Sequence, residues 1–158
     1  MMINRSSLLA KHIRDVHSGG NWTCVNLKDT LDGISWEQAV RQVEDFNTVA
    51  TLTYHIHYYI TAVLAVFKGG SLNASDKLSF AHPPITCQAD WDRMLADMWA
   101  ETEAFAAIIA RQPEHIWDKT FADEKYGTYY RNIQGIIEHT HYHLGQIALI
   151  KKMLLKAG

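Results

Sequence analysis

Residues 128–156 read TYYRNIQGIIEHTHYHLGQIALIKKMLLK and carry the strongest helix signal in the chain. Apolar side chains recur there every three or four residues, the spacing that gathers side chains on one face of an α-helix. This stripe comprises Ile133, Ile136 or Ile137, Thr140, Leu144, Ile147, Ile150 and Leu154. We therefore predict one long amphipathic helix from Thr128 to about Lys156, roughly 40 Å long at about 1.5 Å per residue.

Three further blocks have the same periodicity, and no segment alternates with the period of two that marks a strand. They run from about Asn4 to His17, from near Asn47 to the Gly69-Gly70 pair, and from near Thr86 to about Gln112. Four amphipathic helices, three of them long, predict an all-α fold, a four-helix bundle. A length of 158 residues predicts a single domain over 1–158.

The segments between these blocks are mostly turn-rich. Residues 21–34 are mixed in composition, and Ser35 with Gln38 forms a capping box that predicts a short helix. Residues 71–85 contain Pro83-Pro84 and predict a long surface connection between the second and third long helices. A short turn of helix is expected at Glu114–Trp117, followed by a polar stretch over 118–127.

Composition excludes several classes of protein. Apolar residues make up 47% of the chain and the formal net charge is −2, so we expect no nucleic acid as the main partner. Cys24 and Cys87 form no CxxC motif, which favours a reducing cytoplasm. The first twenty residues lack the apolar core of a signal peptide, and the near-apolar run Ile60–Phe67 is too short to span a bilayer. We therefore expect no membrane association.

Histidine is unusually frequent, with nine residues, and two short clusters contain five of them. His139 and His143 are four residues apart, so they lie on one helix face and can bind one metal ion. The pair alone is a weak signal, because nine histidines in 158 residues give about half such a pair by chance. His141 lies about 200° around the helix from His139 and must point elsewhere.

The second cluster, His55 and His57, offers a third nitrogen ligand. The two side chains cannot face the same way, and we predict that His55 points inward, because it borders the core positions Ile56 and Tyr59. His55, His139 and His143 would then form a three-histidine metal site with open coordination positions, as catalytic sites have.

Two other interpretations of the clusters remain open. The histidines could be hydrogen-bonded core residues, or interface residues among the neighbouring tyrosines. A di-iron carboxylate site is disfavoured, because the chain has one Glu-x-x-His motif, Glu138 to His141, where such sites need two. His12, His17, His82 and His115 have no partner at ligand spacing and are interpreted as surface or packing residues.

Two stretches are similar to the DinB/YfiT-like superfamily of metalloenzymes. They are Ala50-Thr51-Leu52-Thr53-Tyr54-His55-Ile56 and Glu138-His139-Thr140-His141-Tyr142-His143-Leu144-Gly145-Gln146-Ile147. The family pattern is one histidine early in the second long helix, then His-x-x-x-His followed by Gly-Gln in the last. The sequence departs from it at Leu144, where the family often has arginine, and at His57, a second histidine beside the family's one.

The resemblance implies a four-helix bundle with parallel middle helices, joined through residues 69–85. It also implies a divalent metal, nickel or zinc, held by His55, His139 and His143 at one end of the bundle, and a homodimer. Some related enzymes activate a low-molecular-weight thiol for transfer, and others resemble hydrolases. The expected function is thus a metal-dependent thiol S-transferase acting on a small molecule, with a hydrolase or a non-catalytic metal-binding or stress-response module as alternatives.

No general base is evident from the sequence. Glu138 neighbours the ligands but is expected to point to another face. Gln146 and Tyr59 each lie one turn past a predicted ligand, so they are candidates to form hydrogen bonds around the site.

Overall fold

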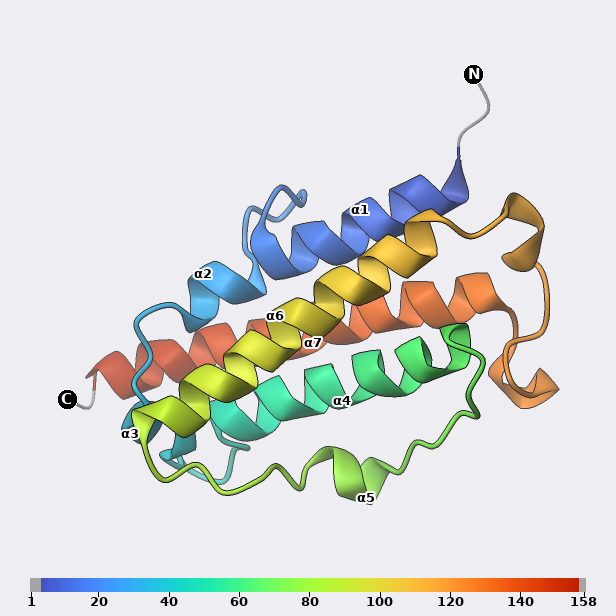
Figure 1. Cartoon of the computed structure of the whole chain (residues 1–158). Helices are drawn as coiled ribbons and strands as arrows, with labels where there is room; N and C mark the ends of the chain where they lie inside the picture. The colour runs from blue at the N-terminus through green and yellow to red at the C-terminus, as the bar shows by residue number, and fades with distance from the viewer. Residues whose placement is uncertain (1–3, 157–158) are drawn as a thin grey trace.

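The computed structural model describes residues 4–156, and within them the chain is helical with no strand, as the sequence predicts (Figure 1). Four helices are long, namely α1 (Arg5–Ser18), α4 (Val49–Phe67), α6 (Gln88–Ala110) and α7 (Tyr129–Lys156). An isolated bridge joins Thr120 to Thr128. The ends of the predicted domain, residues 1–3 and 157–158, lie outside the described residues.

Five short elements connect the long helices. They are α2 (Leu27–Leu31), α3 (Trp36–Val40), α5 (Asp76–Ser79) and the 3-10 helices η1 (Glu114–Ile116) and η2 (Glu124–Tyr126). The capping box at Ser35 and the helical turn at Glu114 are confirmed. α2, capped by the Asn26 side chain, and α5 were not predicted: four or five residues are too few to show a helical period.

Side-chain caps fix where α1, α4 and α7 begin, whereas α6 begins without one. α4 begins one residue later than the sequence indicated, because the Thr48 hydroxyl, rather than Asn47, accepts the hydrogen bond from the Thr51 amide at 3.1 Å. In α7 the Thr128 hydroxyl accepts from the Arg131 amide at 3.2 Å. These bonds satisfy amides that have no partner within the helix.

A long connection joins α4 to α6. α4 and α6 run in the same direction, so the chain between them must return along their full length (Figure 1). α5 lies on this return path and packs against α4. The long surface connection predicted at residues 71–85 is therefore present, and the short helix α5 within it contacts α4.

The hydrophobic core lies between the four long helices. Large side chains with less than 2% exposure include Ile56 and Ile60 of α4, Phe105 of α6 and Ile133 of α7. Truncating one of these to alanine would cost about 2–5 kcal/mol of stability. Two buried tryptophans satisfy their indole N–H groups, since Trp91 donates to the Ile34 carbonyl at 3.0 Å and Trp117 to the Ser6 hydroxyl at 2.9 Å.

α4 is the only helix in residues 4–156 that is long and apolar enough to cross a membrane. Its apolar stretch is the whole of Val49–Phe67, which is longer than the near-apolar run Ile60–Phe67 evident in the sequence. In this protein 56% of that helix's apolar window is buried, and it packs against α6 and α7. Core helices of this kind meet the same criterion of length and composition.

Among the histidines interpreted as surface or packing residues, His17 is a packing residue, at 1% exposure. Its Nδ1–H donates to the Ile13 carbonyl at 2.7 Å, and its Nε2 has no hydrogen-bond partner within the described residues. Burial lowers the pKa of His17 from 6.5 to about 4, with small contributions from His141 and His57. The imidazole is therefore neutral at pH 7.

We predict that His17 makes the protein acid-sensitive. Below pH 6.5 the unfolded chain protonates His17 and the native state does not, so the free energy of unfolding falls as the pH falls towards 4, by about 3 kcal/mol. His17→Leu should remove this part of the pH dependence while leaving stability at pH 7 within about 1.5 kcal/mol. Urea unfolding at pH 7 and 4.5 measures it, with exposed His115→Gln as the control. An unchanged slope in His17→Leu would contradict the assignment.

Candidate metal centre

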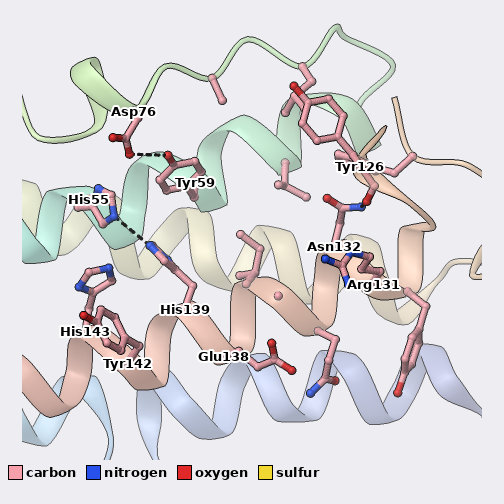
Figure 2. A pocket seen from close by; sticks show the side chains of 18 of the residues that line it. His55, Tyr59, Asp76, Tyr126, Arg131, Asn132, Glu138, His139, Tyr142 and His143 are labelled. Carbon is pink, nitrogen blue, oxygen red and sulfur yellow. Dashed lines mark hydrogen bonds between the residues drawn. The ribbon is translucent and has the colours of Figure 1, made fainter. Parts of the chain in front are cut away.

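Three histidines from two helices meet at one point. His55 comes from α4 and His139 and His143 come from α7, and one ring nitrogen of each lies within 4.8 Å of the other two (Figure 2). The Nε2 atoms of His55 and His139 are 2.9 Å apart. The structure thus brings together the three side chains that were predicted from the sequence to form a metal site.

Helix geometry and packing explain the meeting. His139 and His143 are one turn apart, so both project from the face of α7 that contacts α4. His55 is 4% exposed and His143 is 7% exposed, whereas His139 is half-buried. The ring of Phe80, just after α5, stacks on His55 with the ring centroids 4.0 Å apart.

Hydrogen bonds fix the tautomers of two of these histidines. The Ser79 hydroxyl donates to the Asp76 carbonyl, so it accepts from His55 Nδ1–H at 2.8 Å. Gln146 Oε1 accepts from His143 Nδ1–H at 2.6 Å. Both rings therefore keep Nε2 free of a proton, with its lone pair available to a metal ion, as outer-sphere partners of metal-binding histidines do.

The environment keeps all three imidazoles neutral at pH 7. Burial, together with the neighbouring His143 and His55, lowers the pKa of His139 to about 4. Burial also lowers the pKa of His55 and of His143. Neutral imidazole is the form that binds metal ions, so this part of the protein does not have to lose protons before binding one.

The donor set fits a divalent ion. Because Nδ1 of His55 carries the proton, the hydrogen bond between the rings runs from His139 Nε2–H to His55 Nε2. Two nitrogen ligands of a tetrahedral zinc ion lie about 3.4 Å apart. The observed 2.9 Å is close to that value. His55, His139 and His143 would hold such an ion through one ring nitrogen each.

His57 and His141 lie outside this group. His57 Nε2 lies 2.8 Å from Glu101 Oε2 of α6, and the Thr61 hydroxyl donates to the same carboxylate oxygen at 2.5 Å. His141 is half-buried, and its pKa is lowered by burial and by the nearby His12. These positions agree with the prediction that His57 faces away from His55, and His141 away from His139 and His143.

A phenol and a carboxylate lie beside the three histidines. Tyr59 contacts the rings of both His55 and His139, with ring centroids 5.2 Å away in each case. Its hydroxyl donates to Asp76 Oδ1 at 3.3 Å (Figure 2). Burial raises the pKa of Tyr59, so the phenol keeps its proton at neutral pH.

The histidines form one end of a cavity of about 880 Å³, a volume typical of small-molecule sites. Tyr59, Asp76 and Tyr142 line it near the histidines, and Tyr126 and Arg131 line its other end (Figure 2). Glu138 also lines this cavity, but its side chain points away from the three histidines, as expected from its place on another face of the helix (Figure 2). The histidines are therefore accessible to a ligand.

Two residues of α5, Ser79 and Asp76, lie at the site and were not predicted from the sequence. Ser79 and Asp76 lie in the segment interpreted as a surface connection, 24 and 21 residues from His55, and no spacing rule links them to it. A Ser-Asp pair at 75–76 is a possible helix start that could have indicated a helical turn there. By contrast, Gln146 and Tyr59 both lie at the site, as predicted.

No protein-family model matches the chain, and neither a curated protein nor a solved structure matches it significantly.

We predict that His139→Ala and His143→Ala each abolish stoichiometric binding of zinc or nickel, because a two-histidine remnant holds these ions weakly. His141→Ala should bind one equivalent, as the unchanged protein does. On α4 the matched pair is His55→Ala, which should lose the metal, and His57→Ala, which should keep it. Elemental analysis after dialysis measures this. Equal metal loss in all five variants would refute the ligand set. So would loss of the metal in His57→Ala with retention in His55→Ala.

Ser79→Ala should weaken metal binding about 10–100-fold, because the ring of His55 loses the acceptor that fixes its tautomer. Ser75→Ala is the matched control, since the Ser75 side chain makes no capping hydrogen bond to α5. Isothermal titration with zinc gives both affinities. Identical affinities in the two variants would show that Ser79 does not orient His55.

Proposed function

We propose that this chain is a metal-dependent enzyme that activates a low-molecular-weight thiol for S-transfer to a small-molecule substrate. His55, His139 and His143 are the proposed ligands of a divalent ion, nickel or zinc. The single observation that supports this most strongly is that the three imidazoles form one wall of a large cavity. Three protein ligands beside an accessible space are typical of catalytic sites, whereas structural sites have four ligands.

A divalent ion in such a site lowers the pKa of a bound thiol or water towards neutrality. The chain's own residues then have three tasks. The histidines hold the ion and exclude water from one side of it, since two of them are buried. The Asp76 carboxylate, beside Tyr59, accepts the proton that the thiol loses. The Tyr59 hydroxyl orients that carboxylate and can donate to a developing negative charge on the substrate.

The proposed fold is a DinB/YfiT-like four-helix bundle. The same-direction course of α4 and α6, and the long connection between them, support this proposal (Figure 1). So does the contact of Gln146, in the Gly145-Gln146 pair, with His143. We further propose a cytoplasmic homodimer without nucleic-acid or membrane partners, supported by the net charge of −2 and the aromatic-rich helices.

A metal-dependent hydrolase is the second candidate. The Tyr59–Asp76 pair next to the histidines favours it, because a carboxylate at that position can accept a proton from water as well as from a thiol. A non-catalytic metal-binding module is the remaining alternative from the sequence, and it would need neither the cavity nor this pair.

We predict that a thiol enters the coordination sphere of the cobalt-substituted protein. Cobalt(II) accepts thiolate readily, and a sulfur-to-metal charge-transfer band should appear when cysteine or glutathione is added. His143→Ala, which lacks a ligand, should show no such band, and His141→Ala should show it. Absorption spectroscopy in the near ultraviolet measures the effect.

The other outcomes separate the alternatives. No spectral change with any cellular thiol, together with metal-dependent hydrolysis of an ester or amide, would replace the thiol assignment with the hydrolase. No change and no turnover over a broad substrate panel would favour the non-catalytic module.

A further inference from the structure

The cavity extends well beyond the three histidines. Its far end is lined by Arg131, Tyr126 and Asn132 (Figure 2), and Lys125, which lines the cavity as well, lies over the ring of Tyr126. Arg131 precedes His139 by eight residues on α7, which is about 12 Å along the helix axis. A metal ion and one thiol group would fill only the near end, so the remaining length is available for the rest of a ligand.

The far end carries positive charge that forms no ion pair with a carboxylate of residues 4–156. Arg5, Arg14 and Arg93 each form an ion pair with an acidic side chain. Within residues 4–156, neither Arg131 nor Lys125 pairs with a carboxylate. Lys125 instead lies over the ring of Tyr126, with Nζ 4.9 Å from the ring centroid.

Local structure holds the arginine at this position. Gly127 has φ +72°, and a Cβ added there would lie 2.8 Å from Arg131 Cδ, so the arginine stem packs directly on the glycine backbone. Asn132 stabilises the same turn, since its amide donates to the carbonyls of Tyr126 at 2.9 Å and Thr128 at 2.8 Å. Arg131 is exposed, but its stem is held against this turn, so the guanidinium starts from a supported position.

Charge is divided along the cavity. Asp76 lies at the histidine end, where it accepts a hydrogen bond from Tyr59, and Glu138 lies between the two ends and points away from the histidines (Figure 2). The cations are at the opposite end. An elongated ligand with a metal-binding group at one end and an anionic group at the other would match both the length and the charge.

We propose that the cavity binds an elongated, carboxylate-bearing ligand whose carboxylate is held by Arg131, with support from Lys125. Its metal-binding group, a thiol, rests on the function proposed above. Guanidinium is suited to this role because it can donate two parallel hydrogen bonds to one carboxylate. A span of about 12 Å equals three to four extended peptide units, so the ligand is of tripeptide size.

The test uses two peptides that differ in one group. The first peptide, N-acetyl-Cys-Gly-Gly, has a thiol at one end and a free carboxylate at the other. The second is the same peptide with a C-terminal amide in place of the carboxylate, so it lacks the negative charge. Each is titrated into the full-length cobalt protein, and the charge-transfer band reports binding. The free acid should bind about tenfold more tightly, the effect of one charge-assisted hydrogen bond.

The variants assign this preference to one residue. Arg131→Gln should abolish the preference for the acid and leave the affinity for the amide unchanged. Arg41→Gln, an exposed arginine that does not line the cavity, should behave like the unchanged protein. Equal affinity for acid and amide in the unchanged protein, with the band present for both, would overturn the carboxylate site and leave the thiol function intact.

A second measurement decides the case in which neither peptide changes the cobalt spectrum, which would contradict the thiol function. N-acetyl-Ala-Gly-Gly, which has the carboxylate and no thiol, is added to metal-free ¹⁵N-labelled protein. A shift of the Arg131 Nε–H resonance with the acid but not with its amide would support the anion site independently of the metal. No shift with either would overturn it.

Discussion

The site depends on three imidazoles that are kept neutral and directed at one point between α4 and α7. Two physical effects achieve this. Burial disfavours the protonated form of each ring, and the acceptors Ser79 Oγ and Gln146 Oε1 fix the proton of two rings on Nδ1. Nε2 of His55 and Nε2 of His143 then carry no proton, so each has a lone pair that a metal ion could use. Without these effects the same histidines would be ordinary titrating side chains.

The long return path between α4 and α6 is part of the same arrangement. Because the two helices run in the same direction, the connection must pass along the outside of α4. Along this path Ser79 and Phe80 contact His55, and Asp76 contacts Tyr59. The connection thus completes a site whose histidines come entirely from long helices, and its short helix α5 is where sequence periodicity carries least information.

Much of this could be predicted from the sequence, for reasons that the residues make clear. A period of 3.6 in four blocks indicated the long helices, and the four-residue spacing of His139 and His143 placed them on one face. His55 was preferred over His57 because its neighbours are core residues, and His57 indeed lies against Glu101. The missed features depend on contacts between distant residues. Ser79 meets His55 only through the path of the connection. For His17 the sequence left surface and packing positions open, and the helices around it bury the side chain.

The central claim is that the three histidines hold one divalent ion. X-ray absorption spectroscopy of the zinc-loaded protein measures the coordination directly. The ligand set predicts three imidazole nitrogens at about 2.0–2.1 Å and one further light ligand from solvent. Addition of a thiol should replace that ligand with sulfur at about 2.3 Å. A coordination sphere without three imidazoles, or one closed by a fourth protein side chain, would contradict the claim.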